Sequence, residues 1–122
     1  MGRSRLDLLL ARADGKRLAL KVKSVILVED GVALFPDAVT EREARHVREL
    51  PEIAEREDWE AAILFVLQRW DAGEIRAARR IDPGFAEALE EARGAGVRIL
   101  GRRCRVTRDR IELGPPVPAW VG

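Results

Sequence analysis

Cysteine, histidine and long apolar stretches are scarce in this sequence, and each scarcity excludes a class of protein. The chain has one cysteine and one histidine, so it forms no intramolecular disulfide and has no Cys and His cluster to hold zinc. Its apolar runs fall far short of the roughly 20 residues that a membrane helix needs, and its first residues lack the apolar core of a signal peptide. These absences favour a cytoplasmic protein that does not bind membranes.

Net charge is low as well. Lys and Arg number 22 against 21 Asp and Glu, which leaves +1, so any attraction to nucleic acid must be local. The 47% of hydrophobic and 35% of charged residues are typical of a soluble globular domain. With 122 residues, the chain is expected to form one domain over 1–113 and an extended, mobile, Pro-rich tail over 114–122.

Apolar segments and turn signals predict strands in the first third of the chain. The segments 5–11 and 18–28 are rich in Leu and Val, and the Asp14-Gly15 turn between them predicts a hairpin. Residues 32–35 are expected to extend the same meander as a third strand.

A helix is predicted after this meander. Thr40 and Glu43 have the spacing of a capping box, in which Thr40 accepts from the backbone of Glu43 while the Glu43 side chain reaches back. Apolar residues then recur every three or four positions and define one buried stripe. Because Pro51 interrupts this pattern, we expect a kink or break near Leu50.

The remaining elements alternate between strands and helices. Residues 61–67 form an apolar run typical of a central strand, and 68–81 are expected to be a long loop or irregular helix. Asp82 and Pro83 predict the N-cap and first turn of a second helix. Two more strands are expected, over 97–106 and 110–113. The order predicts an α/β fold with a mixed β-sheet and flanking helices.

The first two strands bring together a candidate site. Strand alternation places Lys21 and Lys23 on one face of their strand, and Asp7 meets them if the faces of the two strands coincide. One interpretation is a cross-strand salt bridge with a structural role. The other is the remnant of a phosphodiesterase site, in which carboxylates hold a divalent cation and a lysine steadies the attacking water.

In several ordered stretches the sequence resembles the sugar fermentation stimulation protein A family, whose second domain is restriction-endonuclease-like, of the PD-(D/E)-x-K type. The resemblance covers nearly the whole chain. The matching stretches are GRSRLD at 2–7, KVKSV at 21–25, FPDAVTER at 35–42 with Arg45 and His46, FVLQR at 65–69, IDP at 81–83 and AGV at 95–97.

The resemblance implies DNA as the partner and a nuclease-like fold. Asp7 matches the metal-binding aspartate of the family, and Lys23 matches the lysine of its Glu-x-Lys motif, so these two would be catalytic in an active enzyme with Mg²⁺. Asp37 is a weaker candidate for a metal ligand. The candidate DNA contacts are Arg5, Lys21, Lys23, Arg45, His46 and Arg69.

Departures from the family pattern change this expectation. Lys21 replaces the glutamate of the motif, Ile26 replaces a threonine, and Glu43 replaces a glycine. Since Mg²⁺ prefers oxygen ligands and tolerates few nearby cations, we expect an impaired metal site, no cofactor and no efficient cleavage. The N-terminal OB-like domain of the family and the first elements of its fold are also missing, so a bare sheet face is expected, which a homodimer would cover.

Local charge supports a polyanionic partner. Residues 1–23 hold seven basic residues against two acidic ones, and residues 98–110 hold six against one. These segments would contact phosphates, or else the arginines simply solvate edge strands. A lone histidine such as His46 is also more often a surface or capping residue.

Three functions remain open at this point. The first is a DNA-binding domain of nuclease-like fold that binds weakly or non-specifically through the face around Lys21 and Lys23. The second is a metal-dependent DNA nuclease. The third is a remnant that serves protein interaction alone.

Overall fold

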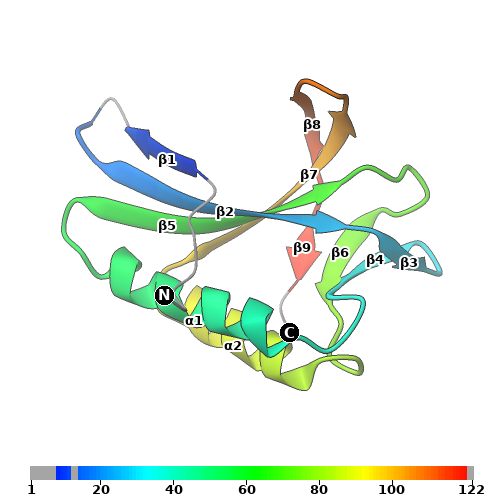
Figure 1. Ribbon diagram of the computed structural model, residues 1–122, viewed down its shortest axis with the longest axis horizontal. Helices are drawn as coiled ribbons and strands as arrows, with labels where there is room; N and C mark the ends of the chain where they lie inside the picture. Colours follow the sequence, from blue (N-terminus) through cyan, green and yellow to red (C-terminus); the bar gives the residue numbers. More distant parts are fainter. Residues whose placement is uncertain (1–7, 12–13, 121–122) are drawn as a thin grey trace.

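The computed structural model describes residues 8–11 and 14–120, which form two β-sheets and two helices (Figure 1). The strands are β1 (Leu8–Ala11), β2 (Arg17–Val25), β3 (Leu27–Glu29), β4 (Val32–Phe35), β5 (Trp59–Leu67), β6 (Glu74–Ala77), β7 (Arg98–Val106), β8 (Ile111–Pro116) and β9 (Ala119–Trp120). The helices are α1 (Glu41–Ala54) and α2 (Pro83–Gly94). The predicted α/β class with a mixed sheet and helices is confirmed.

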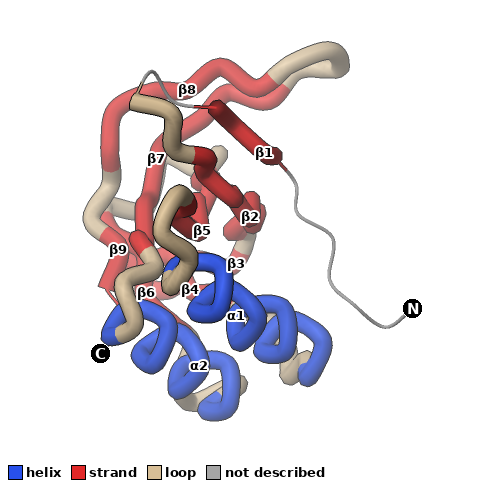
Figure 2. The backbone as a smooth tube through the Cα atoms, turned by 90° about the vertical axis from the view of Figure 1, so that its left-hand side faces the viewer, coloured by secondary structure: helices blue, strands red, loops and turns tan. Residues whose placement is uncertain are grey.

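The larger sheet has the order β1-β2-β5-β7-β8, and both helices lie on one of its faces (Figures 1 and 2). β1 and β2 form the predicted antiparallel hairpin, whereas β2 pairs with β5, and β5 with β7, in parallel. Parallel pairing requires crossover connections, which α1 and α2 provide. The apolar run 61–67 is the central strand, as predicted.

The smaller sheet was not foreseen. Its order is β3-β4-β6-β9, so the expected third strand leaves the first meander. β6 lies within 68–81, where we expected a loop or irregular helix, and it forms because β4 supplies a parallel partner. Residues 114–120, which we expected to form a tail, take part in both sheets: β8 runs to Pro116, Val117 is buried and β9 pairs with β6.

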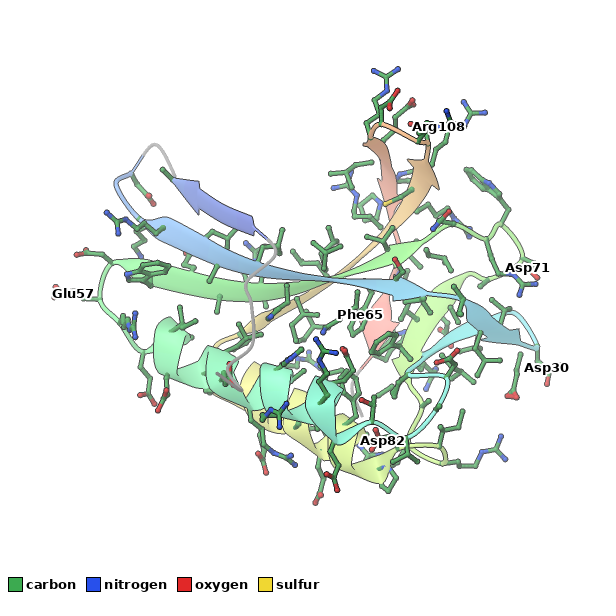
Figure 3. The ribbon with its side chains drawn as sticks, in the orientation of Figure 1. Asp30, Glu57, Phe65, Asp71, Asp82 and Arg108 are labelled. Carbon is green, nitrogen blue, oxygen red and sulfur yellow. The ribbon has the colours of Figure 1, made fainter. Side chains whose placement is uncertain are left out.

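Three phenylalanines join the two sheets to the helices. The ring of Phe35 in β4 lies 5.4 Å from that of Phe65 in β5 and 5.3 Å from that of Phe85 in α2. Figure 3 shows Phe65 between the larger sheet and the helices. The core between these layers is therefore continuous, and the buried residues of α1 belong to it.

Helix α1 continues through Pro51, so the expected kink or break near Leu50 does not end it. Pro51 lacks the N–H that would bond to the carbonyl of Val47. That loss falls in the last turns of the helix, where Val47 and Leu50 are both about 1% exposed and hold the chain against the core. Tertiary packing therefore offsets the missing bond.

The opposite face of the larger sheet is only partly covered. Val22, Leu64 and Leu100 occupy one row across β2, β5 and β7, and each is half-buried. Cys104 is buried, as expected of a small apolar residue in a strand. Within the described residues, neither helix is long and apolar enough to cross a membrane.

Candidate functional site

Two lysines of β2 lie beneath helix α1. Lys21 and Lys23 alternate with residues of the opposite face and have exposed fractions of only 3% and 8%. In the parallel pairing with β5 they stand beside Ile63 and Phe65, which face the helices. We expected both lysines on an open basic face, and the structure instead buries them, because α1 packs across this end of the strand.

The start of α1 is held by two side chains. The Thr40 hydroxyl accepts a hydrogen bond from the backbone N–H of Glu43 at 3.4 Å, as the capping box predicts. The second half of the box does not form: the Thr40 N–H donates instead to Asp82 Oδ2 at 3.0 Å. Asp82 Oδ1 also accepts from the Phe85 N–H at 3.1 Å, as the predicted N-cap of α2. One carboxylate therefore ties the two helix starts together.

Because Asp82 takes that role, the Glu43 side chain is available for another partner. It forms an ion pair with Lys23, and the two side chains are 24% and 9% exposed. The sequence placed Glu43 in the capping box alone and did not predict this pair. One signal was present in the sequence: Glu43 replaces a glycine of the family pattern.

His46 lies one turn further along α1 and completes the cluster. Its Nδ1 atom is buried and has no hydrogen-bond partner among the described residues. Burial, followed by the charges of Lys23 and Lys21, lowers the pKa of His46 below its ordinary value of 6.5. These effects favour the neutral imidazole, and the structure brings together Lys21, Lys23, Glu43 and His46.

The other residues predicted for the site do not belong to this cluster. Arg5 and Asp7 lie outside the described residues. Arg45 is exposed on α1, and Asp37 is exposed in the loop before it. Arg69, at the end of β5, donates to Asp71 at 3.0 and 2.5 Å and to the carbonyl of Ile26 at 3.4 Å. Arg69, predicted as a DNA contact, therefore has partners within the protein.

Comparison with known proteins identifies the family. Residues 1–110 match the family model of the sugar fermentation stimulation protein RE domain. The chain belongs to the sugar fermentation stimulation protein (SfsA) family. It therefore carries the nuclease-like domain of that family, and the resemblance drawn from the sequence is confirmed.

Curated SfsA relatives and a solved structure agree with this assignment. The chain is 45% identical to a homologue from Citrifermentans bemidjiense over 97% of its length, and 44% identical to one from Geobacter sulfurreducens over 98%. SfsA from Pyrococcus furiosus, described in complex with Ca²⁺, matches 96% of the chain with a TM-score of 0.83 and 30% identity. In all three comparisons the chain spans about half the length of its relative.

Among the described residues, the cluster beneath α1 offers a single carboxylate, that of Glu43, to a hard divalent cation. Such ions take several oxygen ligands and carboxylates above all, but here the Glu43 carboxylate is paired with an ammonium group and a second lysine stands two residues from the first. Within 8–11 and 14–120, no group of three or more His, Cys, Asp or Glu residues is arranged to hold a metal.

Proposed function

We propose that this SfsA domain binds DNA weakly and without marked sequence preference, through the surface around the start of α1, and that its metal site is impaired. The observation that carries the proposal is the pair Lys21 and Lys23 on the buried face of β2, where the resemblance places the Glu-x-Lys motif. Replacing the acid of that motif by a lysine removes a ligand for a cation and adds a positive charge at the same position.

The buried lysines and the exposed arginines have different roles in this proposal. Lys21 and Lys23 lie too deep to contact a phosphate, and Lys23 is paired with Glu43, so in this proposal the two lysines replace the cation ligands of the motif rather than contact DNA. Arg42 and Arg45 are exposed on α1 and are placed to contact the backbone of DNA. Binding of this kind reads charge rather than base sequence, and its dissociation constant at physiological salt is typically about 10⁻⁴ to 10⁻⁶ M.

Fluorescence anisotropy with a short labelled duplex tests the proposal. We expect the affinity to fall steeply between about 50 and about 200 mM salt. Arg45→Ala should lower the logarithmic salt slope by about 1, as the loss of one phosphate contact does. Arg93→Ala is the matched control, because it removes an exposed charge at the far end of α2. A wild-type affinity that ignores salt would contradict phosphate binding.

A metal-dependent nuclease is the alternative, because the related Pyrococcus furiosus SfsA is described in complex with Ca²⁺. Incubating supercoiled DNA with the protein and Mg²⁺ or Mn²⁺ separates the two functions. We expect no metal-dependent nicking above that of a mock preparation. Nicking that is lost in Asp7→Ala would establish the nuclease and refute the binding-only function.

A further inference from the structure

An exposed tryptophan stands on a tightly held loop at the end of β5. Trp70 is 76% exposed, the largest exposed fraction among the large hydrophobic residues of the described chain. The guanidinium carbon of Arg103 lies 5.3 Å from the centroid of its ring. Arg103 thus covers part of the indole, and the high exposure of the side chain leaves a large part of the ring open to solvent.

The loop that carries Trp70 is fixed from both sides. Arg103 donates to the carbonyl of Arg69 at 2.9 Å and also to that of Ala72. Arg69 in turn is paired with Asp71 and reaches the Ile26 carbonyl. A ring held in this way loses little conformational entropy when a ligand stacks on it.

A hollow opens beside the ring. It has a volume of about 430 Å³ and is bounded by the loop after β5 and by the β7–β8 hairpin, and this volume falls within the usual range for small-molecule sites. Figure 3 labels Asp71 in that loop and Arg108 at the tip of the hairpin. Its lining includes Gln68, Trp70, Arg103, Arg105, Glu112 and Leu113.

The charge around the hollow favours an anionic ligand. Residues 102–112 hold five arginines against Asp109 and Glu112. Arg105 is exposed at the hollow, while Glu112 lies 3.6 Å from the guanidinium of Arg110 and is partly neutralised. An open indole face beside an exposed guanidinium group, here that of Arg105, is an arrangement that binds unpaired nucleotides, with the base on the ring and the phosphate on arginine.

We propose that this hollow is a binding site for a single-stranded stretch of nucleic acid, in which one unpaired base stacks on Trp70. Arg105 contacts the adjoining phosphate, and the amide of Gln68 is available to the edge of the base. The inference extends the proposed DNA binding and rests on it for the class of polymer. It concerns different residues, because none of the side chains around the hollow belongs to the cluster beneath α1.

A protein partner is the competing occupant, since Leu113 is also 57% exposed here. The excess of arginines favours nucleic acid, because the core of a protein interface is depleted of charge. A second copy of this chain bound at the hollow would make the sedimentation coefficient rise with concentration, and Trp70→Ala would abolish the rise.

The test compares single-stranded oligothymidine with a duplex of the same length, using the intact chain. Trp70→Ala should weaken single-strand binding about tenfold and leave duplex binding within about twofold, while Trp70→Phe keeps most of the affinity. Trp120→Ala is the matched control, because Trp120 is 47% exposed on β9 in the smaller sheet. In a Trp59→Phe/Trp120→Phe chain, oligothymidine should quench the emission of Trp70 in a saturable manner.

The outcomes separate this inference from the proposed function. Single-strand affinity that is equal in wild type and Trp70→Ala, with duplex binding intact, overturns the stacking site alone. Failure of the wild type to bind either polymer overturns both proposals. Self-association that Trp70→Ala abolishes assigns the hollow to a second copy of the chain and also overturns the inference. Thermal unfolding of each variant confirms that the folded proteins are compared.

Discussion

The ammonium group of Lys23 is paired with the carboxylate of Glu43 at the buried junction of β2 and α1. The two residues are 20 positions apart in sequence and come from different kinds of element. Removing one member of a buried pair leaves the other charge without compensation, which costs more than the pair contributes. Removing either charge of this pair should therefore change both the stability of the domain and the net charge of the candidate site.

Glu43→Gln is expected to destabilise the protein and to strengthen its binding to DNA. The loss of stability should be about 1–3 kcal/mol, below the value for fully buried pairs because Glu43 is partly exposed. Urea unfolding at pH 7 measures the first effect and anisotropy with duplex DNA the second. Glu41→Gln is the control, because it removes the same charge from an exposed position in the same turn. Equal behaviour of the two variants would contradict a specific role for the pair.

His46 should report the electrostatics of the same cluster. It is the single histidine of the chain, so the imidazole signals of untagged protein in proton NMR belong to it. Its pKa is lowered by burial and then by Lys23 and Lys21, and we expect a midpoint below 6.5 that rises in Lys23→Met. An unchanged midpoint in that variant would show that the lysine charge does not reach the imidazole.

The same shift predicts a dependence of stability on pH. Because the pKa is lower in the folded state, the unfolded chain binds the proton first as pH falls. The contribution of His46 is therefore neutral above pH 6.5 and becomes destabilising as pH falls below it. When the pH falls from about 7.5 to about 5.5, the free energy of unfolding of His46→Gln should decrease less than that of wild type, as measured by urea unfolding. A parallel loss in both proteins would contradict the shift.

A charge reversal at Lys21 tests whether lysine is what weakens cation binding. Lys21→Glu adds a carboxylate and removes an ammonium group, so its affinity for Ca²⁺ or Mn²⁺ should rise about tenfold or more over wild type. Isothermal titration measures it. Arg45→Glu makes the same change of charge on the exposed face of α1 and should give little gain. No gain in Lys21→Glu would leave the motif assignment at this position unsupported.

Local signals in the sequence predicted the helices and the central strand, but they did not predict which residues meet. Thr40, Asp82 and Pro83 marked the helix starts because capping depends on neighbouring residues. The bond from the Thr40 N–H to Asp82 spans 42 residues, and no local pattern indicates it. Because the bond to Asp82 could not be predicted, the capping box was the one role predicted for Glu43, and its pairing with Lys23 was not predicted.

The smaller sheet was missed for a similar reason. Residues 74–77 show no clear apolar period, and the strand forms because Val32–Phe35 lies alongside it. β9 is two residues long and depends in turn on β6. Strands this short are specified by their neighbours rather than by their own composition, so sequence reasoning placed them in a loop and a tail.

Gly101 holds the two sheets close together, and alanine should not fit there. A Cβ at this position would lie 2.7 Å from the carbonyl oxygen of Val117 and 2.9 Å from Cδ1 of Ile75. Because a backbone atom cannot move aside cheaply, Gly101→Ala should cost about 1–3 kcal/mol in urea unfolding. Gly94→Ala is the control, since open space surrounds that helical position. We expect it to be neutral or stabilising, by up to about 1 kcal/mol.

Asp82 should be the most sensitive polar position of the fold. The residue is 5% exposed, and its carboxylate accepts from the N–H groups of Phe85 and Thr40. Asp82→Ala removes a helix cap and leaves a second N–H without its partner, which together should cost about 2–4 kcal/mol. Asp82→Asn keeps one acceptor and should lose less than half of that. Because Thr40 starts the helix that carries Glu43 and His46, Asp82→Ala should also change the imidazole midpoint of His46. An unchanged midpoint in a folded Asp82→Ala protein would show that α1 is positioned by its core contacts alone.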